Sequence, residues 1–199
     1  MTHGHDAAVS TVPVATTRSV MEVPTGRLAV WWVLASEIVI FGGLLGVYIM
    51  QRIGHPGWAN QSIHTNTLAG SINTFILLSS SLSAVLAHQA AERGDGPRAA
   101  RLLRLTALGG ASFLVVKSIE WTHEIREGFT ITSNLFWSFY YTAAGLHALH
   151  VIAGMIIMLI VAAGAARNQH LHRVENIGIY WHFVDIVWIF LFPLLYIAK

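Results

Sequence analysis

Several ionisable side chains lie within strongly apolar stretches of the sequence, and five of them are candidates for chemistry. Glu37 is in the middle of the first stretch, and two pairs with i, i+3 spacing follow in later ones. The pairs are His147 with His150, and His182 with Asp185. Because residues three apart share one face of a helix, each pair presents its polar groups together. Carboxyl and imidazole groups so placed can bind protons, form buried hydrogen bonds or ligate a metal.

The chain as a whole is far more apolar than a water-soluble domain. Of its 199 residues, 54% are hydrophobic and 11% are charged, against about 25% charged in an average soluble domain. The mean hydropathy is +0.57. These values exclude disorder and predict an integral membrane protein. The absence of Cys excludes disulfides, iron–sulfur clusters and thiolate metal sites, and a net charge of +2 gives no indication of nucleic-acid binding.

Five stretches are long enough to cross a bilayer, which takes about 20 mostly apolar residues. They are residues 28–50, 66–88, 99–122, 135–166 and 176–198. All are continuous apolar runs without the alternation of a transmembrane β-strand. We therefore predict an all-α fold, with one membrane domain of five helices over residues 27–199. The polar residues 1–26 are expected to form a disordered tail without a cleavable signal peptide, in which His3 and His5 are not a metal site.

Basic residues are distributed unequally between the two ends of these helices. An excess of Arg and Lys marks cytoplasmic loops, so the richer side is expected to be cytoplasmic. The N-terminus would then be inside and the C-terminus outside. The richer side holds eight residues and the other side three: Arg18, Arg27, Arg93, Arg98, Arg101, Arg104, Arg167 and Arg173 against Arg52, Arg126 and Lys199. Lys117, within the third stretch, is expected to snorkel or to pair with Glu120.

Tryptophans near the helix ends are typical of the interfacial belts of membrane proteins. On this ground we expect four of them to anchor the bundle at the two interfaces: Trp31, Trp121, Trp137 and Trp181. Small residues indicate where helices meet, because they let a neighbouring backbone approach closely. Gly42, Gly43 and Gly46 form such a pattern directly after Glu37. Pro193 is expected to bend the last helix.

Ionisable groups inside a bilayer cost about 2.5–3.5 kcal/mol each, so each needs a partner or a role. We hypothesise that Glu37 is protonated or hydrogen-bonded and faces protein or bound lipid; the alternative is a helix–helix hydrogen bond without further function. The four residues of the two pairs are expected to form one polar seam between the fourth and fifth helices.

A metal or haem site is the other chemistry that these residues allow. His147, His150 or His182 could be an axial haem ligand. A di-iron bundle needs two Glu-x-x-His motifs and two further Glu, whereas the sequence has one such motif, Glu120 to His123, at the end of a predicted helix. Hydrogen-bonded buried polar groups are therefore the favoured interpretation.

Several motifs, in order along residues 27–198, resemble the haem-copper oxidase subunit III family. Residues 36–43, SEIVIFGG, are similar to its acidic helix, and residues 73–81, NTFILLSSS, to the next helix, which ends in His88. IEW at 119–121 with GF at 128–129 is similar to its outer loop. The two strongest matches are GLHALHVIAG at 145–154 and YWHFVDIVW at 180–188.

The resemblance implies the short, five-helix bacterial form of an accessory subunit in the plasma membrane. Such a subunit carries no haem or copper, docks on the catalytic subunit I and on subunit II, binds phospholipid and supports proton uptake. Glu37 would be the family's intramembrane carboxylate, and His147, His150, His182 and Asp185 its buried polar set.

Two departures leave the subtype open. The Trp-Pro-Pro motif of longer members is absent, and residues 117–121 look closer to the branch that accompanies nitric oxide reductases. The partner is therefore expected to be a cytochrome c or quinol oxidase, with a nitric oxide reductase as the alternative. Two other classes would be told apart by experiment: a membrane cytochrome would bind haem, and a transporter would carry a solute by itself.

Overall fold

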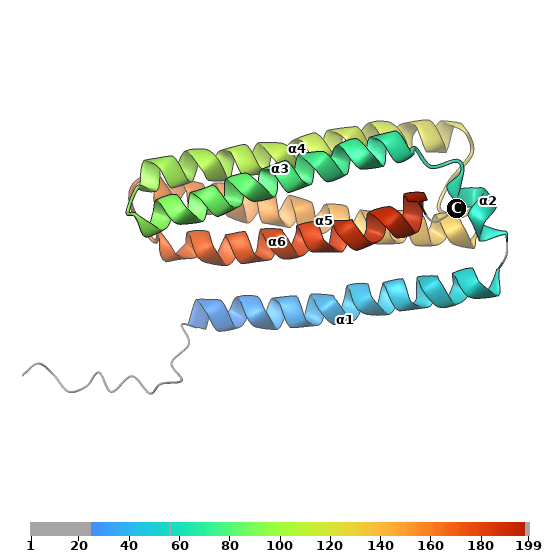
Figure 1. Ribbon diagram of the computed structural model, residues 1–199, viewed down its shortest axis with the longest axis horizontal. Helices are drawn as coiled ribbons and strands as arrows, with labels where there is room; N and C mark the ends of the chain where they lie inside the picture. The colour runs from blue at the N-terminus through green and yellow to red at the C-terminus, as the bar shows by residue number, and fades with distance from the viewer. Residues whose placement is uncertain (1–24, 56, 198–199) are drawn as a thin grey trace, which may run out of the picture.

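The computed structural model describes residues 25–55 and 57–197 (Figure 1). Apart from Thr25 and Gly26, the predicted tail lies outside the described residues, and so do His3, His5, Arg18 and Lys199. The elements in chain order are α1 Thr25–Gly54, α2 Trp58–Ser62, α3 Thr67–Glu92, α4 Gly96–Arg126, α5 Leu135–Ala165, α6 His172–Phe192 and the π-helical turn η2 Pro193–Ile197.

Five of these helices are long and apolar enough to cross a membrane. The spans are Gly26–Gly54, Thr67–Glu92, Gly96–Arg126, Leu135–Ala165 and His172–Ile197. Throughout the described residues the regular structure is helical, so the predicted all-α fold with five spans is confirmed. The last helix changes from α to π geometry at Pro193, where a bend was predicted, because proline has no N–H for the α-helical hydrogen bond.

Local side chains determine where three of the long helices begin. Asn66, Asp95 and Asn134 each accept a hydrogen bond from the backbone N–H three residues further on, at 3.0–3.1 Å. Such N-caps satisfy N–H groups that have no partner within the helix. Between α3 and α4 the chain reverses at Gly94, whose φ of +75° favours glycine. Short, capped connections of this kind keep consecutive helices adjacent and antiparallel.

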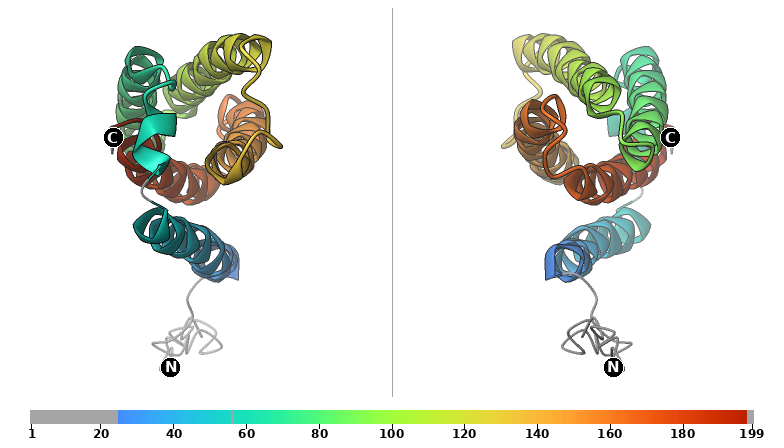
Figure 2. Two further views of the ribbon diagram at one scale, coloured as in Figure 1. Left: turned by 90° about the vertical axis from the view of Figure 1, so that its right-hand side faces the viewer. Right: turned by 90° about the vertical axis from the view of Figure 1, so that its left-hand side faces the viewer.

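The helices α3, α4, α5 and α6 form a ring in which each packs on the next, and α3 closes it against α6. The end views show this ring, with α1 lying outside it along α6 (Figure 2). Apart from its contact with α6, α1 touches α5. Glu37, on α1, therefore lies at the edge of the ring and not at its centre.

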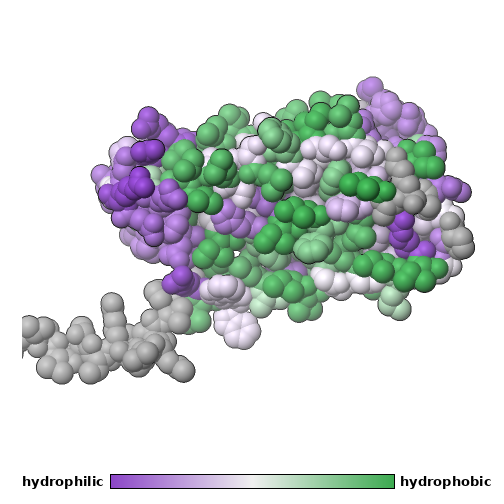
Figure 3. Space-filling model, in the orientation of Figure 1, coloured by the Kyte–Doolittle hydropathy of each residue, from purple (hydrophilic) through white to green (hydrophobic). Residues whose placement is uncertain are grey.

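The two ends of the bundle differ in charge. We call one the arginine-rich end, defined by Arg27, Arg93, Arg98, Arg101, Arg104, Arg167 and Arg173. The opposite end carries α2, the α4–α5 loop and η2, and we call it the α2 end. An apolar belt separates hydrophilic surfaces at the two ends (Figure 3). Which end faces the cytoplasm stays a prediction.

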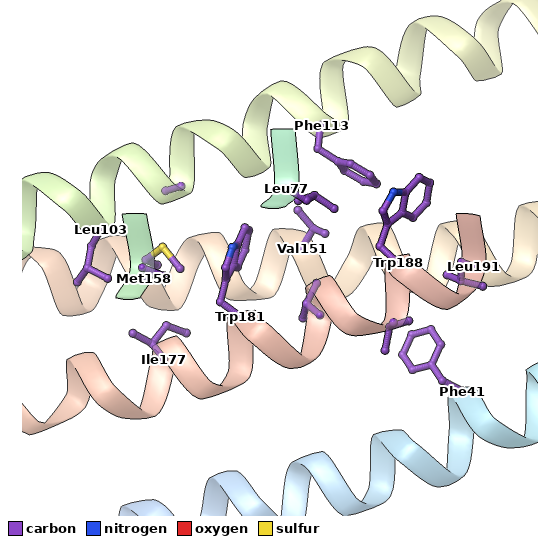
Figure 4. Close-up of a cluster of buried hydrophobic side chains, with 14 of the residues drawn as sticks. Phe41, Leu77, Leu103, Phe113, Val151, Met158, Ile177, Trp181, Trp188 and Leu191 are labelled. Atoms are coloured by element: carbon purple, nitrogen blue, oxygen red, sulfur yellow. The ribbon is translucent and has the colours of Figure 1, made fainter. Parts of the chain in front are cut away.

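Large aromatic side chains fill the inside of the ring (Figure 4). Trp181 and Trp188 of α6 are 0% and 1% exposed, and Phe113 of α4 is 0% exposed. Trp181 fits because its neighbours are small: a Cβ on Gly110 would lie 2.7 Å from its ring, and one on Gly154 3.1 Å. Glycines on α4 and α5 thus open the space that this indole fills.

The predicted interfacial role is wrong for two of the four tryptophans. Trp137 and Trp181 are fully buried in protein, so their rings are not exposed to lipid headgroups. Trp31 is 57% exposed at the arginine-rich end, as an anchor requires. Trp121 is partly buried against Tyr141. Position along a helix did not predict the face on which these residues lie.

Candidate functional site: a carboxyl–histidine pair on the first helix

Glu37 of α1 and His150 of α5 meet where the first helix crosses the ring. Glu37 Oε2 lies 3.0 Å from His150 Nε2, and their side chains are 15% and 16% exposed. The imidazole ring also packs edge-on against Phe41, with ring centroids 5.2 Å apart. The hydroxyl of Tyr180 donates a hydrogen bond to the backbone oxygen of His150 at 3.3 Å. Glu37 therefore faces a protein partner held in place by side chains from α1 and α6.

The hydrogen bond at Nδ1 of His150 limits what its Nε2 can do toward Glu37. Its Nδ1 lies 2.8 Å from the backbone oxygen of Leu146. A carbonyl oxygen can only accept, so Nδ1 carries a hydrogen. At Nε2, either a neutral ring accepts a proton from a carboxylic acid or a charged ring donates one to a carboxylate. Either arrangement would place one proton between the two atoms, although Glu37 Oε2 has no hydrogen bond of good geometry among the described residues.

Three polar contacts attach α1 to the rest of the bundle. Arg27 and Glu175 form an ion pair of 2.8 Å at the arginine-rich end. Glu37 and His150 meet midway. At the α2 end, the Tyr48 hydroxyl donates to the backbone oxygen of Leu194 at 2.7 Å. That carbonyl is free to accept because it lies in η2, after the α-helix has ended.

Between these contacts, grooves run along both sides of α1. One groove of about 300 Å³ lies against α5 and α6, with Val33, Val161 and Tyr180 in its walls and Arg173 near the arginine-rich end. Another, of about 240 Å³, lies between α1 and α6 and is lined by Ile38, Gly42, Phe183 and Ile186, among others. Both grooves are almost wholly apolar, so they suit hydrocarbon.

The other predicted polar residues do not form one seam. His182 Nδ1 lies 2.6 Å from the hydroxyl of Ser81 on α3, whereas His150 faces α1. His147 is fully buried, with its ring against Phe113 and Trp188 at 5.3 and 5.2 Å. Among the described residues, the ring nitrogens of His147 have no hydrogen-bond partner, and the carboxyl group of Asp185 lies beside Ser81. The expectation of one shared seam is wrong because His150 faces α1, whereas His182 and Asp185 lie beside Ser81 of α3.

The small-residue face of α1 is not packed against described residues of this chain. A Cβ on Gly42, Gly43 or Gly46 would meet nothing within 4 Å. The close approach that these glycines allow is therefore not used inside the bundle. We continue to expect it at a contact with another chain.

Lys117 does not snorkel; it lies in a buried cluster near the α2 end. Its Nζ donates to Glu120 Oε2 at 3.1 Å and to the Tyr140 hydroxyl at 2.8 Å, and it also contacts the Tyr196 hydroxyl. Pairing with Glu120, the other expectation, is confirmed. Our sequence reasoning missed Glu124, Tyr140 and Tyr196. The i, i+3, i+7 spacing of Lys117, Glu120 and Glu124 was the available signal, since it places all three on one helix face.

The arrangement does not favour a metal centre. Within residues 25–55 and 57–197, no group of three His, Asp or Glu side chains could hold a metal ion. The two residues of the single Glu-x-x-His motif have different partners. Glu120 binds Lys117, whereas His123 lies 3.6 Å from Glu127 at the exposed helix end. Since His147 is enclosed by aromatic rings, its nitrogens are not open to an incoming haem iron either.

The fold and these sites define a multi-pass helical membrane protein in which several buried polar groups contact one another between the helices. A family model described as "Cytochrome c oxidase subunit III" matches residues 17–199. A cytochrome c oxidase subunit 3 of Corynebacterium diphtheriae is 36% identical over 83% of this chain and 84% of its own length. Those of Thermostichus vulcanus and Bacillus subtilis are 34% and 31% identical, over 82% and 94% of this chain and 83% and 93% of their own.

The chain belongs to the cytochrome c oxidase subunit III family. Membership makes it part of an oxidoreductase complex and implies association with the other oxidase subunits.

Proposed function

We propose that this chain is a non-catalytic accessory subunit of a respiratory haem-copper oxidase in the bacterial plasma membrane. In this proposal it stabilises the catalytic subunit I, contacts subunit II, binds phospholipid and supports proton uptake during oxygen reduction. The observation that carries the proposal is the Glu37–His150 pair, in which a carboxyl oxygen and a ring nitrogen lie 3.0 Å apart within the membrane-spanning part of α1. The names of the relatives favour cytochrome c oxidase over a quinol oxidase or nitric oxide reductase.

We further propose that the haem and copper of the complex are bound by the partner subunits and not by this chain. The histidines in its spans are engaged elsewhere: His150 with Glu37, His182 with Ser81, and His147 between aromatic rings. An optical spectrum and metal analysis of the isolated chain test this proposal. Haem or metal in stoichiometric amount would contradict it.

Phospholipid is proposed to occupy the grooves beside α1. The groove near Arg173 has apolar walls for an acyl chain, and the guanidinium can bind a phosphate. A lipid there would fill space that side chains leave open between α1 and the ring. Mass spectrometry of the purified complex should detect bound phospholipid, and Arg173→Gln should release part of it.

The Glu37→Gln variant of the intact complex tests the proton function. A Gln amide can donate to His150 Nε2, so the contact between α1 and α5 is kept while the exchangeable proton is lost. We expect normal assembly and a normal initial rate. The number of turnovers before inactivation, or the number of protons translocated per electron, should fall.

Ser36→Ala is the matched control, because Ser36 is exposed and its hydroxyl bonds only to the backbone oxygen of Val33. It should behave as the wild type. If Glu37→Gln also matched the wild type in both sustained turnover and proton stoichiometry, Glu37 would be a packing residue and the proton function would be withdrawn.

A further inference from the structure

The buried cluster around Lys117 contains more acid than base. Lys117 and Glu124 are each 2% exposed and Glu120 is 4% exposed. Tyr140 of α5 and Tyr196 of η2 complete the cluster and are fully buried. One ammonium group thus faces two carboxyl groups. Since an unpaired buried charge is costly, the second carboxyl group needs a donor, a cation or a proton.

The ammonium group of Lys117 has no donor left for Glu124. Its three N–H groups are directed to Glu120 Oε2 and to the hydroxyls of Tyr140 and Tyr196. An ammonium group has three donors, so all are used. Glu120 is therefore the direct counter-ion of Lys117, and Glu124 has no direct contact with a positive charge.

The tyrosine hydroxyls near Glu124 do not supply the hydrogen bonds that a charged carboxylate would need. Its Oε1 accepts from the Tyr140 hydroxyl at 2.8 Å. Its Oε2 lies 3.5 Å from the Tyr141 hydroxyl. The single hydrogen of Tyr141 is directed to the backbone oxygen of Phe129 at 2.8 Å, because that carbonyl can only accept. Toward Glu124 the Tyr141 oxygen presents a lone pair, which suits an O–H on Glu124 and repels a carboxylate.

A pocket of about 400 Å³ connects the cluster to the α2 end of the bundle. Glu120 and Glu124 lie in its wall, together with His64 from the α2–α3 loop, and His123 and Glu127 from the end of α4. His123 and Glu127 lie 3.6 Å apart and are largely exposed. The charged group nearest to Glu124 inside the protein is thus the Lys117–Glu120 ion pair. Water in the pocket can deliver a proton to Glu124 or remove one.

We propose that this cluster is a proton-binding site that opens at the α2 end, with the bound proton on Glu124. Lys117 and Glu120 remain an ion pair, Tyr140 donates to Glu124 Oε1, and the acid O–H on Oε2 faces the oxygen of Tyr141. The proton comes from water in the pocket and returns to it. The site is separate from the Glu37–His150 pair, which lies between α1 and α5.

Infrared spectroscopy of the purified oxidase complex at neutral pH tests the proposal. The wild type should show a protonated-carboxyl C=O band that is lost in Glu124→Gln. Gln is neutral and of similar size, so the cluster should remain assembled. The matched control is Glu127→Gln, which alters an exposed carboxylate in the same pocket and should retain the band. Tyr141→Phe, which removes the acceptor of the acid O–H, should shift the band without abolishing it.

The pH dependence of stability gives a second readout. Raising the pH removes the proton and leaves a second buried carboxylate without a counter-charge. The melting temperature of the wild type should therefore fall on alkalinisation more steeply than that of Glu124→Gln. The proposal is overturned if wild type and Glu124→Gln have the same carboxyl bands, and equally if added Na⁺ or Ca²⁺ stabilises an ionised Glu124. If Glu124→Gln does not assemble, an unchanged band in Tyr141→Phe overturns it.

Discussion

Gly110→Ala is expected to destabilise the bundle through a single methyl group. Gly110 of α4 faces the indole of Trp181, which is fully buried. A Cβ there would lie 2.7 Å from Trp181 Cη2 and 2.9 Å from Met155 Sδ. Since carbon atoms in contact prefer about 3.5–4.0 Å, the indole has to move by roughly 1 Å. Gly154 of α5 already lies against another edge of this ring, which limits the space for such a movement.

The cost follows from these contacts. Overpacking a filled core costs about 1–3 kcal/mol. Moving the indole also weakens the hydrogen bond from Trp181 Nε1 to the Ser80 hydroxyl, which is 3.1 Å long and contributes about 1 kcal/mol. We therefore expect Gly110→Ala to lower the free energy of unfolding by about 2–4 kcal/mol. The ring of four helices would then lose stability where α3, α4, α5 and α6 meet.

Thermal unfolding of the complex, followed by tryptophan fluorescence, measures this effect. The matched control is Gly178→Ala in α6, a buried position where a Cβ meets nothing within 4 Å. There the higher helix propensity of Ala should leave stability unchanged or raise it by up to about 1 kcal/mol. If Gly110→Ala melts at the same temperature as Gly178→Ala, the close packing of Trp181 does not hold the ring together.

Two further substitutions test how α1 is held and what it contacts. Tyr48→Phe removes the hydrogen bond to the Leu194 carbonyl and should cost about 1 kcal/mol; faster proteolysis of the α1–α2 connection would reveal it, and unchanged cleavage would argue against a role for this contact. Gly46→Leu should leave the fold of the chain intact, because nothing lies within 4 Å of a Cβ there, but should reduce co-purification with subunit I; normal recovery of the complex would place the interface elsewhere.

The positions of the helices could be predicted because hydrophobic length is a local property. A run of apolar residues must span the bilayer as a helix, since its backbone groups find no other partners in lipid. The face of each helix could not be predicted in the same way. Trp181 is buried because Gly110 and Gly154, far away in the sequence, make room for it. The composition of one helix does not show which residues of the other helices have shapes that fit against it.

The partners of buried polar groups on other helices could not be predicted from residue spacing along one helix either. Glu37 and His150 were both singled out, yet nothing in their spacing indicated that they meet across α1 and α5. For Lys117 the local pattern was sufficient to predict Glu120, because the two are one turn apart on α4. Tyr196, which contacts the same ammonium group, comes from the far end of the chain. Local spacing predicts contacts within a helix, whereas contacts between helices depend on the packing of the ring.

The two proton-binding groups proposed for this chain differ in how they reach their surroundings. Glu37 and His150 lie beside the grooves of α1, and Glu124 lies beside the pocket at the α2 end. Between them His147 is enclosed by Phe113 and Trp188, and its ring nitrogens have no hydrogen-bond partner among the described residues. Each proposed site is therefore expected to exchange its proton with its own surroundings, which are the grooves of α1 for Glu37 and the pocket at the α2 end for Glu124.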